Sequence, residues 1–277
     1  MQSFKNKNIV ITGAGSGIGK SLSNEFAKEG ARLILCDLDI ESLESHACEL
    51  RENNIEASSY FADVSNYDSM KEFSDKVLKD HNHIDVLINN AGVNLMDRFI
   101  DGDLNDFKWV MDINFWGTVY GVNLFLENLL SRDEAHIVNI SSILGLMSLP
   151  GQAAYNSSKA AIKGFTEALK MELTDTSVNV TCIHPGGVKT NIAIKAKTGT
   201  TISKDTKEKL ISDFDKLSYT TSKSAAQQIV KGIKSNKRRI MVGIDAKIAD
   251  LLVRVFPNNY EKIMGLEKRY KRYKNSK

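Results

Sequence analysis

Residues 8–20 read NIVITGAGSGIGK, and this stretch decides which fold we expect. The apolar run at residues 9–11 is typical of a fully buried strand, and Leu22, Phe26 and Ala27 follow it at helical spacing. A glycine-rich turn joins the two segments. The order strand, turn, helix predicts the first half of a βαβ unit.

The turn itself contains Gly13, Gly15, Gly17 and Gly19. Glycines let the backbone adopt left-handed angles and approach a ligand closely, and the free N–H groups of the following helix suit a phosphate. The spacing of Gly13, Gly17 and Gly19 is G-x-x-x-G-x-G, which differs from the usual dinucleotide fingerprint G-x-G-x-x-G. The turn alone therefore leaves two interpretations open, a nucleotide-binding loop and a tight structural turn.

The composition limits the class of protein. The chain has 277 residues, of which 42% are hydrophobic, and a net charge of +3, which is too small to indicate nucleic acid by itself. Cys36, Cys48 and Cys182 lack metal-type spacing, and the first expected strand begins close to the N-terminus. We therefore expect a cytoplasmic protein with no disulfide framework, metal site, signal peptide or membrane span.

Strand and helix patterns alternate along most of the chain. The expected strands are residues 9–11, 31–37, 55–61, 84–88, 135–140, 178–183 and 239–243. The later helices are expected at residues 40–50, 67–79, 109–130, 153–172 and 222–234. This alternation predicts a single-domain, doubly wound parallel α/β sheet of the Rossmann type over residues 1–245, with about seven strands and helices on both faces. Ligands of such sheets bind at the carboxyl ends of the strands.

Asp37 stands at the end of the second expected strand. A carboxylate at this place can accept hydrogen bonds from both ribose hydroxyls of NAD, and it would repel the additional phosphate of NADP. Leu38 offers no compensating cation, so we expect a preference for NAD. Lys20 and Arg32 are the nearest basic residues and leave NADP open. The alternative is that Asp37 only caps a turn or the next helix.

Tyr155 and Lys159 are four residues apart on an expected helix, so they share a face. A free tyrosine has a pKa of about 10, and a nearby ammonium lowers it, so that the pair can move a proton near neutral pH. Ser142 follows the fifth expected strand, where its hydroxyl could hold the same substrate oxygen. A surface or packing role for the pair is the alternative.

Several motifs occur together in one order. They are TGAGSGIG at residues 12–19, NNAG at residues 89–92, Asn114, Ser142, YNSSK at residues 155–159 and PGGVKT at residues 185–190. As a set they resemble the short-chain dehydrogenase/reductase family, in its compact single-domain branch, over residues 5–245. The resemblance also accounts for the unusual glycine spacing, which is the family's own variant. It implies hydride transfer between a nicotinamide cofactor and a secondary alcohol or ketone.

The same resemblance implies roles for individual residues. Tyr155 would be the general acid/base, and Lys159 would lower its pKa and hold the nicotinamide ribose. Ser142 would orient the substrate oxygen, and Asn114 would fix a water in a proton relay. The residues implied to bind the cofactor are Gly13, Gly15, Ser16, Gly17, Ile18, Gly19, Asp37, Asp63, Val64, Asn90, Ala91, Gly92, Tyr155, Lys159, Pro185, Gly186, Val188 and Thr190.

The substrate and the assembly are less defined. Residues 190–217 are polar and lysine-rich, and they could form either a mobile lid over the cleft or a solvated pair of helices. The resemblance implies substrate contacts by Leu144, Leu146, Met147, Leu149, Ile192 and Ile194, which suit an apolar steroid-, retinoid- or acyl-like alcohol. It also implies a homodimer or homotetramer formed through the helices at residues 109–130 and 153–172.

Two other functions compete with a dehydrogenase. One is a catalytically inactive nucleotide-sensing or scaffold protein on the same fold, which we would expect to lose Tyr155, Lys159 or Ser142. The other is a sugar-nucleotide epimerase or dehydratase, whose relatives have a different glycine spacing and a larger C-terminal substrate domain. All three residues are present in this chain.

The C-terminal region, residues 246–277, is expected to be an amphipathic helix followed by a basic tail. The helix at residues 246–256 carries an apolar stripe, namely Ile248, Leu251, Leu252, Val255 and Phe256. The tail contains Lys268, Arg269, Lys271, Arg272, Lys274 and Lys277. We expect the stripe to pack on the domain or on a partner subunit. The alternative is weak, salt-sensitive contact of the tail with an anionic membrane surface.

Overall fold

The chain folds around one parallel sheet, in a computed structural model that describes residues 1–199 and 204–266. The strands are β1 (Asn8–Thr12), β2 (Arg32–Asp37), β3 (Ala57–Phe61), β4 (Val86–Asn89), β6 (Ala135–Ile140), β7 (Val178–Pro185) and β11 (Arg239–Val242). They are ordered β11-β7-β6-β4-β1-β2-β3, and every pair is parallel. The predicted doubly wound sheet is confirmed, with β11 at one edge.

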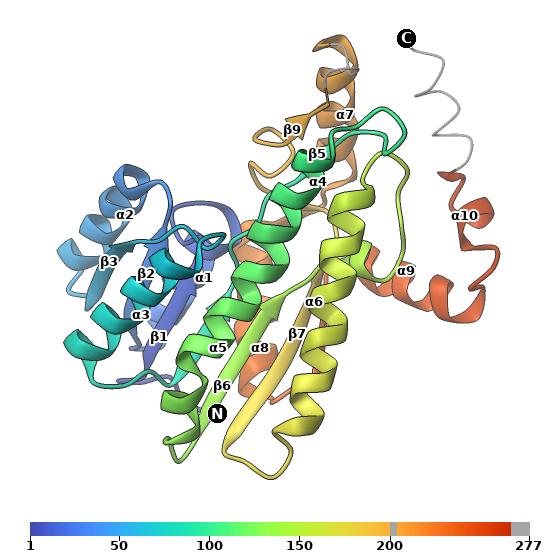
Figure 1. Cartoon of the computed structure of the whole chain (residues 1–277). Coiled ribbons are helices and arrows are strands. Elements are labelled where there is room, and N and C mark those ends of the chain that lie inside the picture. Colours follow the sequence, from blue (N-terminus) through green and yellow to red (C-terminus); the bar gives the residue numbers. More distant parts are fainter. Residues whose placement is uncertain (200–203, 267–277) are drawn as a thin grey trace.

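Helices cover both faces of this sheet because successive strand residues point to opposite sides. Ile11 of β1 packs in one apolar layer with Phe26 and Ile229, whereas its neighbour Val10 packs in the other layer with Phe125. The first layer contains α1 (Gly17–Lys28), α2 (Ile40–Glu52) and α8 (Ser222–Lys234), and the second contains α3 (Tyr67–His81), α5 (Gly117–Leu130) and α6 (Ala153–Glu172). Figure 1 shows α5 and α6 in front of the sheet and α8 behind it.

The long helix expected at residues 109–130 is interrupted. The structure has α4 (Leu104–Met111), a π-helical turn (Asp112–Trp116) and then α5. Asn114 lies in this turn and holds the backbone of Val93 from both sides: its Oδ1 accepts from the Val93 N–H at 2.8 Å, and its Nδ2 donates to the Val93 carbonyl at 3.1 Å. Single π-turns often occur at functional sites, and hydrophobic periodicity gives no signal for them.

The described part of residues 190–217 is attached to the rest of the molecule. The short strand β9 (Lys197–Thr198) pairs with β5 (Leu95–Met96), and β8 (Val188–Lys189) pairs with β10 (Thr220–Thr221). Met96 packs with Ala193 and Ala196 from the first part of this stretch. It also packs with Leu210 and Phe214 from the helix α7 (Lys204–Leu217). The stretch is therefore anchored by apolar contacts, and its movement as a lid stays a prediction.

The C-terminal helix docks through a different face from the one expected. In α9 (Ile244–Val255) the buried residues are Ala246 and Ala249, whereas Ile248 is 53%, Leu251 62% and Val255 56% exposed. Phe256 is also exposed, at 45%, so packing of the stripe on the domain is wrong for these four residues, because the alanine face of the helix is the one that meets the fold; packing on a partner subunit stays a prediction. A short helix, α10 (Tyr260–Ile263), follows. The basic cluster at residues 268–277 lies outside the described residues.

Within residues 1–199 and 204–266, every helix is too short or too polar to cross a membrane.

Candidate active site

One cavity of about 980 Å³ lies at the carboxyl ends of the strands. Its wall contains all the predicted cofactor and catalytic residues except Gly15, Gly19 and Asn114. Gly15 and Asn114 hydrogen-bond to Asp37 and Val93, which do line the cavity, and Gly19 lies against the carbonyl of Gly13. The cavity runs from Asp37, after β2, to Tyr155 on α6.

The glycine turn needs glycine for two separate reasons. Gly13 and Gly17 have φ angles of 65° and 56°, in the left-handed region. Gly19 has no such angle, but a Cβ there would lie 2.2 Å from the carbonyl oxygen of Gly13. Ser16 precedes α1 without capping it, so the positive N-terminal end of the helix is directed at the cavity wall. These features fit a bound phosphate group.

The loop after β4 holds the glycine turn in place. The Asn90 side chain donates from Nδ2 to the carbonyls of Thr12 and Gly13, at 2.9 and 3.0 Å. In return, the Thr12 hydroxyl accepts from the backbone N–H groups of Asn90 and Ala91, both at 3.0 Å. Asn90 therefore acts on the turn through hydrogen bonds that tie two neighbouring strand ends together.

Asp37 does not cap the following helix. Its Oδ2 accepts from the Gly15 N–H at 2.8 Å, and its Oδ1 accepts from the Asp39 N–H at 3.0 Å. Asp39 is the N-cap of α2, and hydrogen bonds from Ser42 lower its pKa. Asp37 thus stands at the cavity wall, tied to the glycine turn, as a ribose-binding carboxylate would be.

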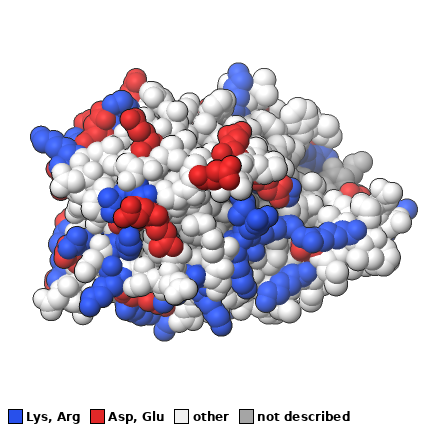
Figure 2. Space-filling model, turned by 90° about the horizontal axis from the view of Figure 1, so that it is seen from below, with Lys and Arg blue, Asp and Glu red and all other residues white. Residues whose placement is uncertain are grey.

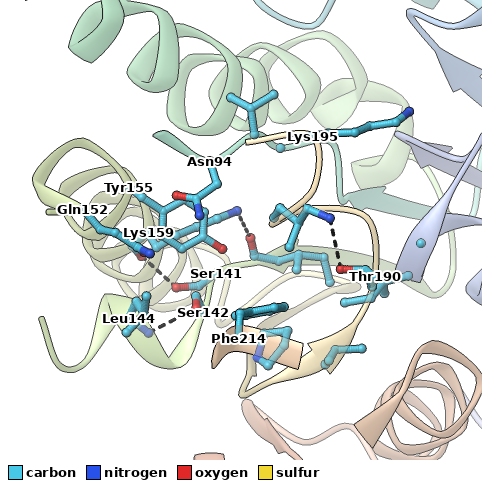
Figure 3. A pocket seen from close by; sticks show the side chains of 18 of the residues that line it. Asn94, Ser141, Ser142, Leu144, Gln152, Tyr155, Lys159, Thr190, Lys195 and Phe214 are labelled. Carbon is cyan, nitrogen blue, oxygen red and sulfur yellow. Dashed lines mark hydrogen bonds between the residues drawn. The ribbon is translucent and has the colours of Figure 1, made fainter. Parts of the chain in front are cut away.

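The two cations considered from the sequence are both occupied elsewhere. Lys20 pairs with Glu49 at 3.3 Å and Arg32 pairs with Glu56 at 2.8 Å, and neither lines the cavity. Lys195 does line it. In Figure 3 its side chain extends across the far side of the cavity from Tyr155. Sequence reasoning missed Lys195, because the cavity wall that it joins is formed by segments that are far apart in the chain.

Ser142, Tyr155 and Lys159 lie together at the other end of the cavity (Figure 3). The Lys159 Nζ donates to the carbonyl of Ile140 at 2.9 Å and lies 5.7 Å from the centroid of the Tyr155 ring. The Ser142 Oγ accepts from the Leu144 N–H at 3.1 Å. The Ser142 hydroxyl also hydrogen-bonds with the Tyr155 hydroxyl, so a substrate oxygen placed between the two could take over this bond.

The pKa of Tyr155 moves in the opposite direction to the one expected from the sequence. Burial raises it to about 12, and a hydrogen bond with the Ser142 hydroxyl opposes this shift. Burial also lowers the pKa of Lys159 to about 8. The ammonium does not dominate because both groups are shielded from water, and low-dielectric surroundings favour the neutral form of each.

Asn114 connects the π-helical turn to this group. Its Nδ2 also donates to the Ser158 hydroxyl at 2.9 Å. A Cβ at Gly92 would lie 3.1 Å from the Asn114 Oδ1 and 3.3 Å from the Lys159 Nζ. A glycine at position 92 therefore leaves the space between the cavity and these two polar groups open.

The remaining wall is largely apolar. Leu144, Met147, Leu149 and Ile192 line it as expected, whereas Leu146 and Ile194 do not, and Ile194 is 57% exposed. The expectation of substrate contact is wrong for these last two, because neither side chain reaches the cavity.

Three polar residues that line the cavity were missed by the sequence reasoning. Asn94 and Gln152 line the cavity, and among the described residues neither the Asn94 Oδ1 nor the Gln152 Oε1 has a hydrogen-bond partner. Gln152 precedes Tyr155 by three residues, so helical spacing could have found it. Asp245 is joined to Gly187 by a bond from the Gly187 N–H to its Oδ2, at 2.6 Å. No sequence pattern signals this contact over 58 residues.

The comparisons agree with this geometry. Residues 7–201 match the family model described as short chain dehydrogenase. The chain belongs to this family. SadH from Mycobacterium tuberculosis is 35% identical over 268 residues, which cover 96% of each chain. The Dehydrogenase/reductase SDR family member 7B of Danio rerio is 31% identical, over 95% of this chain and 85% of its own length.

Two solved structures are similar to this short-chain dehydrogenase. A short chain dehydrogenase/reductase from Burkholderia phymatum, in complex with NAD, has a TM-score of 0.84 and 27% identity, covering 92% of this chain and 95% of its own. An alcohol dehydrogenase from Thermococcus sibiricus, complexed with 5-hydroxy-NADP, has a TM-score of 0.73 and 26% identity, covering 86% and 96%. This short-chain dehydrogenase is accordingly an oxidoreductase with a Rossmann-type fold.

Proposed function

We propose that this short-chain dehydrogenase transfers a hydride between a nicotinamide cofactor and a secondary alcohol or ketone. The observation that carries the proposal is a single cavity that joins the glycine turn and Asp37, at one end, to Ser142, Tyr155 and Lys159 at the other. A dinucleotide that reaches from Asp37 toward Tyr155 would bring its reactive ring next to a proton donor.

The side chains divide the proton chemistry between them. Tyr155, with a pKa of about 12 in the protein alone, is a neutral phenol that can donate its proton to a ketone oxygen. Ser142, whose Oγ already accepts from Leu144, can donate to the same oxygen. Lys159 and Asn114 stand behind Gly92 and can return a proton through a water. A bound reduced nicotinamide would supply the hydride for the ketone carbon; in alcohol oxidation the oxidised ring would accept it, and its positive charge would favour the phenolate that takes the proton.

The cofactor would be held by the residues predicted from the sequence. Gly13, Ser16, Gly17 and Ile18 line the end of the cavity where the phosphates would lie, and Asp63 and Val64 line the part where the adenine would lie. The remaining predicted residues in the cavity wall would follow along the dinucleotide; they are Asn90, Ala91, Gly92, Pro185, Gly186, Val188 and Thr190. Asp37 favours NAD, and Lys195 is the cation that could offset it for NADP. The NAD and 5-hydroxy-NADP complexes of the two similar structures are compatible with either cofactor.

We propose an apolar substrate with a secondary alcohol or ketone, in the class of steroid, retinoid or acyl alcohols. Leu144, Met147, Leu149 and Ile192 support this class, and Phe214 adds an aromatic wall from the segment proposed as a lid. The unpartnered oxygens of Asn94 and Gln152 would accept hydrogen bonds from a polar group near the reacting carbon. A homodimer or homotetramer formed through α5 and α6, in the cytoplasm, completes the proposal.

The test is cofactor oxidation or reduction with a panel of secondary alcohols and ketones. Replacing Tyr155 by Phe should lower kcat by a factor of about 100 to 10,000, because the proton donor is lost, while the cofactor Kd changes little. Tyr67→Phe is the matched control: this tyrosine lies on α3, is 44% exposed and does not line the cavity. Retained turnover in Tyr155→Phe would refute the role of Tyr155. Tight cofactor binding without turnover by the unmutated protein would instead favour the inactive, nucleotide-sensing alternative.

A further inference from the structure

Helix α9 presents four large aliphatic side chains to solvent. We name Ile244, Ile248, Leu251 and Val255 the α9 apolar face; they are 64%, 53%, 62% and 56% exposed. Their spacing of four, three and four residues places them in one row along the helix. Single exposed aliphatic residues are ordinary, but a continuous row of them on one helix indicates a surface that something else covers.

The helix is held firmly with this face outward. On its opposite side Ala249 packs with Met147 and Leu266. Asp250 pairs with Arg239 of β11 at 2.7 Å. A rotation that buried the apolar face would break these contacts. Thus the row of aliphatic side chains is exposed because the rest of the helix is anchored.

Positive charge lies beside the α9 apolar face. Lys247, Arg254 and Lys262 are all exposed, and among the described residues neither Lys247 nor Lys262 makes an ion pair. The acidic side chains of α9 are engaged: Asp245 accepts from Gly187, and Asp250 pairs with Arg239 and Arg254. Exposed Glu261 is the one counter-charge on α10. Figure 2 shows mainly uncharged surface at the right-hand end, where α9 and α10 lie in Figure 1.

We propose that the α9 apolar face docks on an anionic lipid membrane, with its four aliphatic side chains among the acyl chains and the flanking cations at the headgroups. An aliphatic row bordered by Lys and Arg is the composition of helices that lie in the membrane interface. The sequence adds six cations and no acidic residue over residues 268–277, which increases the attraction to anionic lipid.

A second copy of the chain fits this surface less well. A twofold contact brings the same patch of both copies together, so the cations of one copy (Lys247, Arg254 and Lys262) would lie opposite the cationic patch of the other. Like charges opposed in this way disfavour the contact, whereas anionic headgroups favour it. Charge complementarity therefore selects the lipid surface.

The docked helix would also bring the cavity close to the membrane. Ala249 on the inner side of α9 lines the cavity, as do Met264 and Leu266 just beyond α10. One helix therefore separates the cavity from the lipid, and an apolar substrate dissolved in the membrane would have a short path. The docking itself does not depend on the proposed activity, since it is measured without substrate.

The experiment is co-sedimentation with vesicles of phosphatidylcholine alone and with about one-third phosphatidylglycerol. The unmutated protein should bind the anionic vesicles, and binding should weaken as salt is raised. The double variant Leu251→Gln/Val255→Gln should bind at least about tenfold more weakly. Met171→Gln is the control, because Met171 is 71% exposed near the end of α6, on another surface. Lys247→Gln/Lys262→Gln should lose about fivefold or more, on anionic vesicles only.

Three results would overturn the proposal. The first is the absence of vesicle binding by the unmutated protein, and the second is equal binding by Leu251→Gln/Val255→Gln. The third is a dimer, in sedimentation velocity, that this double variant converts to a monomer, because a second copy would then cover the face. Thermal unfolding verifies that the double variant is folded; exposed substitutions of this kind should change Tm by no more than about 2 °C.

Discussion

At the scale of single residues, Asp37 has two roles, and a substitution that removes its whole side chain would abolish both at once. Its carboxylate carries the charge expected to repel a 2′-phosphate, and its Oδ2 also accepts from the Gly15 N–H in the glycine turn. Removing the side chain would therefore change the charge and release the turn. Asparagine separates the effects, because its amide oxygen keeps the acceptor while the charge disappears.

We predict that Asp37→Asn shifts the ratio of kcat/KM for NAD to that for NADP toward NADP by about tenfold or more. Its Tm should stay close to that of the unmutated protein. In Asp37→Ala the same shift should come with weaker binding of both cofactors, since the Gly15 N–H loses its partner. Steady-state kinetics with both cofactors measure this, and a preference for NADP in the unmutated protein would refute the role of Asp37.

At the scale of elements, α9 is connected to the cofactor side of the cavity through one carboxylate. Asp245, in its first turn, accepts from the Gly187 N–H at 2.6 Å, in the loop between β7 and β8. Asp250, one turn further on, connects the same helix to β11 instead. The two aspartates provide a matched pair: both attach α9, but Asp245 alone contacts the loop that lines the cavity.

We predict that Asp245→Ala raises the cofactor Kd by about five- to tenfold, because the loop after β7 loses a charge-assisted hydrogen bond. The free energy of unfolding should fall by about 1–3 kcal/mol. Asp250→Ala should also lower stability, by breaking the pair with Arg239, but should leave the cofactor Kd unchanged. Fluorescence titration with NADH decides; equal changes in Kd for the two variants would show that the effect is not local.

At the scale of the whole molecule, buried histidines make the fold sensitive to acid. Burial lowers the pKa of His136 to about 3 and that of His184 to about 4, in the latter case against a hydrogen bond with the Ser142 carbonyl. In the unfolded chain both histidines take up a proton near pH 6.5, whereas in the folded chain they stay neutral until a lower pH. The contribution of the two neutral histidines to the free energy of unfolding is therefore fully present above about pH 6.5. It is lost as the pH falls toward their pKa values in the folded protein.

We predict that each of the two histidines costs about 2 kcal/mol of stability between pH 7 and about pH 5. Guanidinium unfolding at both pH values measures the change. In His136→Gln the loss over this interval should be smaller by about the same amount, even if the variant is less stable at neutral pH. An unchanged pH dependence in that variant would mean that His136 is not the titrating group.

The sequence by itself determined the sheet, the family and most of the cavity wall. These follow from local patterns: strand ends at Thr12, Asp37 and Asn89 are visible in the chain, and parallel strands bring their carboxyl ends to one edge. Tyr155 and Lys159 could be predicted to share a face because helical spacing is a property of neighbouring residues.

Only the tertiary structure decided what covers each residue. It placed Asn114 in a π-helical turn, joined Asp245 to Gly187, and left Leu251 exposed although its apolar spacing suggested burial. It also reversed the expected pKa shift of Tyr155, because burial depends on every segment that surrounds the ring. Periodicity reports how a segment divides its own polarity between two faces. Which face meets the core is fixed by distant parts of the chain, and that information is absent from any local pattern.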